Sequence, residues 1–265
     1  MEALKTKEIV IPPEKTFGKP LKSVSGEEIF YPESDGKPMA DNTKQYRWIV
    51  KIKEGLESLF ADNPDVFVAA DLFWYPVKGS NKIRTAPDVM AAFGRPKGDR
   101  GSYIQWKENN IAPRAVFEIL SPGNRPGEMR KKFGFYERYG VEEYYIYDPD
   151  RAVLKVWVRS GNRLSPVKNT QGWVSPGLKI RFEITDCELV ITSPDGQKFL
   201  SPLEAEQRAI MTVKAERERA IKAEKTAETE RKRAVKAEKT VEAERKKARI
   251  LADKLRELGI CPESL

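Results

Sequence analysis

Histidine is absent from the 265-residue chain, and cysteine occurs only at Cys187 and Cys261. Without histidine, the sequence excludes a Ser-His-Asp or Cys-His catalytic unit and a histidine-ligated zinc site. Two cysteines are too few for a disulfide framework or a four-thiolate zinc site. Any hydrolytic chemistry must therefore use carboxylates, lysine, or a metal ion held by oxygen ligands.

Long apolar runs are absent as well. No window approaches the roughly 20 apolar residues that a membrane-spanning helix needs. The N-terminus, MEALKTKEIVIPPEKTFG, has no apolar segment typical of a signal peptide. The low cysteine content is typical of a reducing compartment. We therefore expect a cytoplasmic protein with no membrane role.

Composition changes abruptly near residue 200. All five Trp and all eleven Phe lie in residues 1–200, whereas residues 203–258 contain no aromatic residue, proline or glycine. The second composition, dominated by Ala, Glu, Lys and Arg, is typical of a long helix. We expect an irregular N-terminal lead-in at 1–40, a globular domain at 41–200 and a charged helical tail at 201–265.

The tail repeats itself at a spacing of two heptads, since RAIKAEKTAETERK from Arg219 recurs as RAVKAEKTVEAERK from Arg233. This repeat indicates a coiled coil. One seven-residue series reads Val213, Ala220, Ala227, Ala234, Val241, Ala248, Leu255. The companion series reads Ala209, Glu216, Ala223, Glu230, Ala237, Glu244, Leu251, Leu258. Alanine and glutamate bury little apolar area, so a homodimer would be held mainly at the leucine end. A single solvated helix with Glu–Lys pairs is the alternative.

In the globular region, residues 41–60 predict an amphipathic helix with Asp41 as its N-cap. PGEMRKKFGFYERYG predicts a second helix, closed by Gly140. Apolar, β-branched runs predict strands. These runs lie at 65–77, 81–94, 114–122, 164–167, 179–184 and 187–192, with a hairpin at 142–161. The order of elements predicts an α/β (α+β) fold with a mixed central sheet flanked by helices.

Glu118 is the first candidate for chemistry, because it interrupts the apolar run RAVFEIL. An uncompensated charge in a buried strand costs several kcal/mol, so such a carboxylate normally has a cation, a metal ion or a proton as its partner. An edge-strand position facing water would also accommodate it. Period-two alternation argues against that alternative, because it places Glu118 on the same face as Val116 and Leu120.

Asp88 is the second candidate. It follows Pro87 at the start of the apolar run Val89–Phe93, where a strand end would place it at the rim of the sheet. A Pro-Asp pair alone is common in turns. Adjacent strands lie about 4.8 Å apart, however, so two carboxylates on neighbouring strands can share one divalent cation.

Lys132 is the third candidate. At about 100° per residue, Met129, Phe133 and Tyr136 define an apolar arc of the second helix, and Lys132 falls inside it whereas Lys131 falls outside. Lys132 should therefore point at the sheet. Its stem could simply cover apolar surface. Alternatively, its ammonium could lie near both carboxylates and stabilise charge during phosphoryl chemistry.

The segments TAPDVMAAFG, AVFEILSPGN and KKFGFYERYGVEEYYIYDPD resemble the Uma-two-type restriction endonucleases, a family within the PD-(D/E)XK nuclease superfamily. The resemblance covers roughly residues 40–190 and implies a restriction-endonuclease-like fold for the domain at 41–200. It implies that Asp88 supplies the Asp of PD and Glu118 the second acid. Leu120 occupies the usual place of the superfamily lysine, which is displaced onto the following helix as Lys132.

The resemblance further implies a Mg²⁺-dependent endonuclease that hydrolyses phosphodiester bonds of nucleic acid, with DNA favoured over RNA. Asp88 and Glu118 would bind Mg²⁺, or Mn²⁺ as a substitute, with the backbone carbonyl of Ile119 as a further ligand. The net charge of +8 suits a polyanionic partner. The alternative is an inactive nuclease-fold module that binds or assembles through its helical tail.

A loop between two predicted strands is a further hypothesis for nucleic-acid contact. The sequence GRPKGDRGSYIQWKENN mixes cations with aromatic residues, which can contact phosphates and stack on bases. The cations are Arg95, Lys97, Arg100 and Lys107, and the aromatic residues are Tyr103 and Trp106. Mixed-charge loops of this kind are more often simply solvated.

Overall fold

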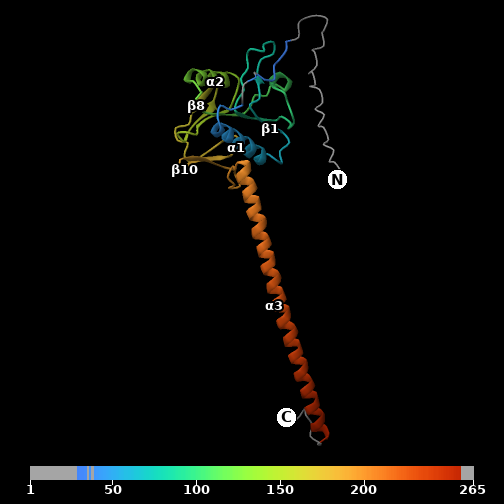
Figure 1. Cartoon of the computed structure of the whole chain (residues 1–265). Coiled ribbons are helices and arrows are strands. Elements are labelled where there is room, and N and C mark those ends of the chain that lie inside the picture. The colour runs from blue at the N-terminus through green and yellow to red at the C-terminus, as the bar shows by residue number, and fades with distance from the viewer. Residues whose placement is uncertain (1–28, 35, 37–38, 258–265) are drawn as a thin grey trace, which may run out of the picture. The chain divides into compact units, whose positions relative to one another are not determined.

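The computed structural model describes residues 29–34, 36 and 39–257 (Figure 1). The chain divides into two compact units, with the boundary between Ser201 and Pro202. Most of the predicted irregular lead-in lies outside the described residues. Its described part contacts the domain, because the ring of Tyr31 packs against Tyr75 and Trp106.

A six-stranded mixed sheet forms the centre of the first unit, in the order β1-β3-β5-β6-β7-β8. Its strands are β1 (Val66–Ala70), β3 (Val89–Phe93), β5 (Ala115–Ile119), β6 (Glu143–Asp148), β7 (Val153–Ser160) and β8 (Arg163–Pro166). Strands β5 and β6 are parallel, and the other neighbouring pairs are antiparallel. The predicted mixed sheet with flanking helices is confirmed.

Two smaller sheets complete the strand inventory of the described domain. One pairs β2 (Trp74–Tyr75) with β4 (Tyr103–Ile104), followed by a 3₁₀ turn at Gln105–Lys107. The other contains β9 (Trp173–Val174), β10 (Arg181–Thr185) and β11 (Glu188–Thr192). The predicted strand at 65–77 is divided at Asp71, whose positive φ of 48° turns the chain out of the central sheet.

The two domain helices cover opposite faces of the central sheet (Figure 1). Helix α1 (Thr43–Leu59) packs with β9–β11 against one face, where Val89, Phe117 and Ile119 are buried. Helix α2 (Pro126–Arg138) packs with β2 and β4 against the other, where Met90 and Val116 are buried. Because side chains alternate along β5, Glu118 belongs to the α2 face.

Helix α1 begins one residue later than predicted. Asn42, not Asp41, is the N-cap, and its side chain accepts a hydrogen bond from the Gln45 backbone at 2.8 Å. Asp41 instead accepts a hydrogen bond from the Ser121 hydroxyl at 2.5 Å, which ties the start of α1 to the end of β5. Further along α1, Gly55 lies against the buried ring of Phe199; an added Cβ would lie 2.1 Å from it.

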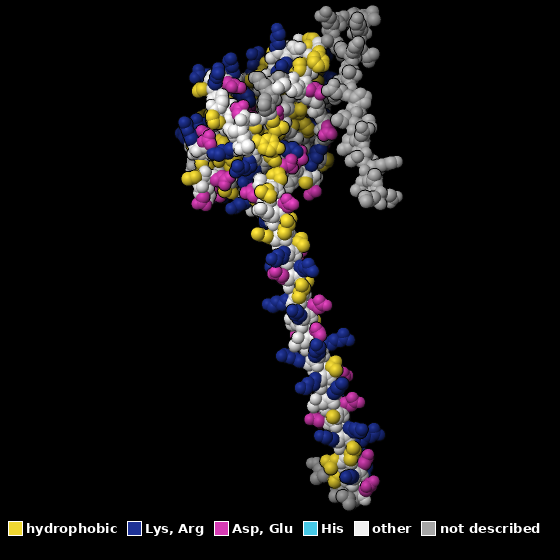
Figure 2. All heavy atoms as spheres, in the orientation of Figure 1, with side chains coloured by type: hydrophobic (Ala, Val, Ile, Leu, Met, Phe, Trp, Pro, Cys, Tyr) yellow, Lys and Arg dark blue, Asp and Glu magenta, His cyan; other side chains and the backbone are white. Residues whose placement is uncertain are grey.

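The tail forms one 56-residue helix, α3 (Pro202–Glu257), which confirms the predicted long helix. None of its residues is buried within the chain, and charged side chains of both signs line it throughout (Figure 2). Lys232 and Glu228 form an i,i+4 ion pair with a 2.6 Å separation. Leu258 and Cys261 lie outside the described residues. No described helix is long and apolar enough to cross a membrane.

Candidate active site

The pairing of β3 with β5 brings the two predicted acids together. Their antiparallel register pairs Val89 with Phe117, so Asp88 and Glu118 each lie one residue beyond this pair, at the same end of the two strands. Asp71 fixes the approach to β3, since its backbone N–H lies 3.1 Å from the Pro87 carbonyl and 3.3 Å from that of Asp88. Residues separated by thirty positions in sequence therefore meet at one end of two neighbouring strands.

Glu118 is buried, with 2% of its surface exposed, and both of its oxygens are engaged. The Tyr136 hydroxyl donates to Oε1 at 2.5 Å, and the Lys132 ammonium contacts Oε2 at 2.7 Å. Both partners come from α2. Burial, followed by the charge of Glu118, raises the pKa of Tyr136 well above its usual value, so this hydroxyl remains a donor. Helix α2 thereby fixes the orientation of the carboxylate.

Lys132 faces the sheet, as the helical arc predicts, while Lys131 is exposed. The Lys132 ammonium also lies 3.2 Å from the Ala86 carbonyl, two residues before Asp88. Burial alone lowers the pKa of Lys132, but the charges of Glu118 and Asp88 outweigh it and raise the pKa above its usual value. The side chain is a charged, hydrogen-bonded partner of the acids, and not merely an aliphatic cover.

Asp88 is held by one backbone hydrogen bond, from the Ile119 N–H to Oδ2 at 2.6 Å. Part of its side chain is exposed to solvent, yet protein closely surrounds the carboxyl group. That burial, together with the charge of Glu118, raises the pKa of Asp88 to about 8, against the opposing effect of Lys132.

Gln45 is a site residue that the sequence prediction missed. Its side-chain amide donates to the Ile119 carbonyl at 2.9 Å, and its Oε1 accepts from the Asp41 backbone at 2.8 Å. Gln45 is 5% exposed and occupies the same face of α1 as Ile49 and Ile52. A polar residue on an otherwise apolar helix face was the available signal.

The model of the Uma2 family, described as "Putative restriction endonuclease", matches residues 37–197. The matched segment includes Asp88, Glu118 and all of α2. The chain belongs to the Uma2 family. It is also similar to a solved structure titled "putative nuclease belonging to DUF820 from Anabaena variabilis", with 17% identity and a TM-score of 0.40 over 53% of this chain and 74% of that chain. No curated protein matches it.

The acid pair of this Uma2 protein offers oxygen ligands of the kind that hard cations prefer, although few of them. In the described part of the chain, no three His, Cys, Asp or Glu side chains are close enough to share a metal ion. Asp88 and Glu118 offer two carboxylates. Both oxygens of Glu118 accept hydrogen bonds, whereas of the two Asp88 oxygens only Oδ2 accepts one from a described residue. Mg²⁺ commonly binds one or two carboxylates and keeps several waters, so these residues fit it.

Tyr144 places a further polar group beside the acid pair. Its hydroxyl is the one buried side-chain polar atom in the described residues without a hydrogen-bond partner. Tyr144 pairs with Val116 across β5 and β6, which places it on the α2 face beside Glu118. Burial, then the charges of Glu118 and Asp88, raise its pKa above the usual value. Buried hydroxyls are normally satisfied by protein or by water.

The loop after β3, for which we hypothesised nucleic-acid contact, uses several of the named side chains within the domain. Arg95 and Arg100 both bind Glu108 at 2.7 Å, and the Lys97 ammonium donates to the Phe60 and Ala61 carbonyls at the end of α1. Tyr103 is fully buried. Three of the four loop cations therefore have partners within the Uma2 domain: Glu108 neutralises the two arginines, and backbone carbonyls hold Lys97.

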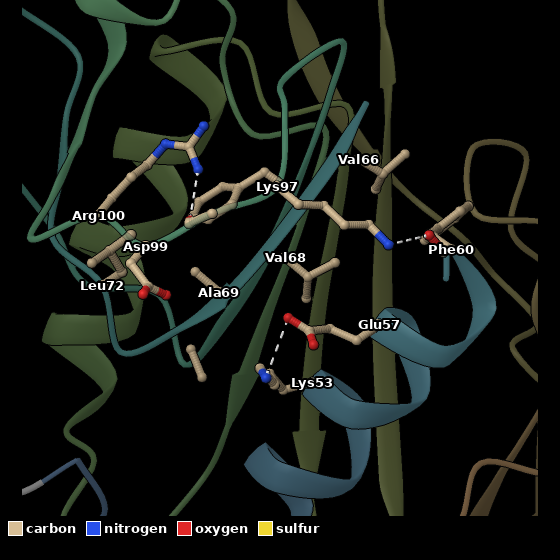
Figure 3. A pocket seen from close by; sticks show the side chains of 13 residues that line it. Lys53, Glu57, Phe60, Val66, Val68, Ala69, Leu72, Lys97, Asp99 and Arg100 are labelled. Carbon is tan, nitrogen blue, oxygen red and sulfur yellow. Dashed lines mark hydrogen bonds and ion pairs between the residues drawn. The ribbon is translucent and has the colours of Figure 1, made fainter. Parts of the chain in front are cut away.

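A cavity of about 440 Å³ lies apart from the acid pair, along β1, the strand at one edge of the sheet (Figure 3). Lys53 and Glu57 of α1 form an ion pair there, and Lys97 reaches across toward Phe60 (Figure 3). Neither Asp88 nor Glu118 lines this cavity. Lysines beside an edge strand discourage pairing with another chain, which explains them without a catalytic role.

Proposed function

We propose that this Uma2 protein is a metal-dependent endonuclease that hydrolyses phosphodiester bonds of nucleic acid, with DNA as the expected substrate. The observation that carries the proposal is the buried carboxylate of Glu118, with Asp88 at the same end of the neighbouring strand and the Lys132 ammonium 2.7 Å from Glu118. Two acids and a lysine on adjoining elements are the groups that metal-assisted phosphoryl chemistry requires, and no histidine base is needed. Family membership supports the same reaction class.

Each residue has a distinct task in this proposal. Asp88 and Glu118 would hold Mg²⁺ or Mn²⁺, together with the Ile119 carbonyl that Gln45 orients. When bound, the cation would polarise the scissile phosphate and the attacking water. Lys132 would stabilise the negative charge that develops on the phosphate oxygens, while Tyr136 keeps Glu118 in place.

The direct test is incubation of purified full-length protein with plasmid and oligonucleotide substrates, with Mg²⁺, with Mn²⁺ and with a chelator. We expect cleavage in the presence of either cation and none with the chelator. Mn²⁺ binding, measured on the same preparations, separates an active nuclease from an inactive module. A chain that neither binds Mn²⁺ nor cleaves any substrate would contradict the proposal.

Replacing Tyr144 with phenylalanine is expected to separate stability from activity. The substitution removes a buried hydroxyl without a protein partner, so the free energy of unfolding should stay the same or rise by about 1 kcal/mol. If that hydroxyl positions the attacking water, kcat should fall by about tenfold or more. Thermal unfolding and single-turnover cleavage measure the two quantities. Unchanged kcat would exclude Tyr144 from the reaction.

We also propose that the protein forms a homodimer through α3. The helix exposes apolar side chains along its length and buries none within the chain, whereas a 56-residue helix is usually stabilised by packing. Leu251 and Leu255 near the end of α3, together with Leu258 just after the described residues, would carry most of the contact.

Changing Leu251, Leu255 and Leu258 to serine is therefore expected to convert a dimer to a monomer at about micromolar concentration, since the remaining Ala and Glu positions bury little apolar area. Sedimentation velocity measures the change.

A chain ending at residue 200 should be a folded monomer that still binds Mn²⁺. The matched control changes Lys239, Lys246 and Asp253, on the opposite side of the heptad, to serine and should remain dimeric. If the unaltered protein is a monomer, the dimer proposal is wrong and α3 is a single solvated helix.

A further inference from the structure

Helix α2 has two faces with different properties. Its inward face carries Lys132 and Tyr136, which hold Glu118. At about 100° per residue, the opposite face is centred between Gly127 and Arg138. The residues on this outer face are Gly127, Arg130, Lys131, Gly134 and Arg138, and all five are exposed.

The outer face of α2 carries three cations, and the two acids of the helix, Glu128 and Glu137, lie at its flanks. Among the described residues, none of Arg130, Lys131 and Arg138 forms an ion pair, and Arg138 only lies over the ring of its neighbour Tyr139, at 5.6 Å. Elsewhere in the domain, arginines with an acid within reach are paired, as Arg114 is with Glu142. Figure 2 shows Lys and Arg side chains over the part of the domain where Figure 1 labels α2. Unneutralised cations on one helix face favour an anionic partner.

The two glycines on this face have no structural need to be glycine. Both lie in the helix, where glycine is among the poorest residues, and a Cβ added at either would meet no atom within 4 Å. Between the cations the face is therefore free of side chains, which allows an extended polyanion to approach the helix backbone closely.

We propose that the outer face of α2 binds the sugar–phosphate backbone of duplex DNA through Arg130, Lys131 and Arg138. The inference rests on the proposed function and adds the surface that holds the substrate beside Lys132. The aromatic side chains of α2, such as Phe133 and Tyr136, pack on the domain core, so the outer face has no ring on which an unpaired base could stack. The contact is therefore to phosphates, independent of sequence.

The test measures binding of full-length protein to a fluorescein-labelled 20-base-pair duplex by anisotropy, in chelator and over a series of salt concentrations. Changing Arg130, Lys131 and Arg138 together to alanine should reduce the slope of log K against log salt by about 2.7, because each phosphate contact contributes about 0.9. The matched control removes the same charge elsewhere on the surface. It changes Lys155, Lys168 and Lys198, all exposed, to alanine and should keep the slope of the unaltered protein.

Gly134→Glu provides a second variant that does not depend on removing side chains. Glutamate is a better helix former than glycine, so the melting temperature should stay the same or rise. The new carboxylate stands four residues from both Arg130 and Arg138 and neutralises them, so affinity for the duplex should fall by about tenfold or more. If the outer face of α2 does not bind DNA, the melting temperature should stay the same or rise while the affinity for the duplex does not change.

The outcomes separate this inference from the proposed function. Equal slopes for the α2 triple variant and the control triple, or no binding by the unaltered protein, would overturn the surface assignment. If the salt slope of the α2 triple variant falls by the predicted amount while the unaltered protein cleaves nothing with Mg²⁺, the surface assignment stands and the nuclease proposal fails. If the unaltered protein cleaves DNA but the α2 triple variant keeps the salt slope of the unaltered protein, the nuclease proposal stands and the surface assignment fails.

Discussion

Glu118→Gln is expected to abolish metal-dependent cleavage while the domain remains folded. The glutamine keeps the shape of the side chain but removes the charge that would hold the cation and pair with Lys132. Loss of a metal ligand should lower kcat by about a thousandfold or more, equivalent to about 4 kcal/mol of transition-state stabilisation. Asp88→Ala should have an effect of the same size, since it removes the other carboxylate.

The chain offers a matched control in Glu143, which is also 2% exposed. Its carboxylate accepts hydrogen bonds from three neutral donors: the Tyr145 hydroxyl in the same strand, and the Ser175 hydroxyl and Gly177 backbone, which fasten a loop to β6. Glu143→Gln should therefore lower stability by about 1–3 kcal/mol and leave kcat unchanged. Circular dichroism and single-turnover cleavage compare the variants. Cleavage at the wild-type rate by Glu118→Gln would exclude the acid pair as the active site.

Lys132→Met should lower kcat by about a hundredfold or more while metal affinity changes little. Methionine keeps the aliphatic stem that covers the sheet but removes the ammonium 2.7 Å from Glu118. An ammonium that stabilises developing charge acts on the rate more than on ground-state metal binding. Single-turnover rates and Mn²⁺ titration measure the two quantities.

Lys131→Ala provides the comparison from the opposite face of the same helix. It should raise KM through weaker, salt-dependent substrate binding and leave kcat near that of the unaltered protein. Equal losses of kcat in the two variants would mean that the ammonium of Lys132 has no special place in the reaction.

Glu118 and Lys132 could be predicted because each depends on a regular periodicity, whereas Asp88 was predicted from its place at the start of a strand and from the family resemblance. Strand alternation placed Glu118 on a buried face, and helical periodicity turned Lys132 toward it; the structure shows both arrangements. Their catalytic roles remain predictions. The mixed sheet and the long tail followed from equally regular patterns of apolar and charged residues.

What could not be predicted depends on contacts between distant segments. Gln45 and Tyr144 belong to the site only because α1 and β6 pack beside β5. The loop cations looked available because nothing in a linear sequence shows that Glu108 folds back onto Arg95 and Arg100. Asn42 displaced Asp41 as the cap of α1 because Ser121, eighty residues away, takes the Asp41 carboxylate.

The contact between Gly55 and Phe199 determines where the domain can be cut. The family match ends at residue 197, two positions before the ring that fills the notch beside α1. A domain trimmed to the matched residues would lose a 5% exposed phenylalanine and leave a hole against Gly55. Such a fragment should be less soluble than one that extends to Ser201. Its low solubility would result from the missing Phe199 and would not be evidence that the domain needs α3 to fold.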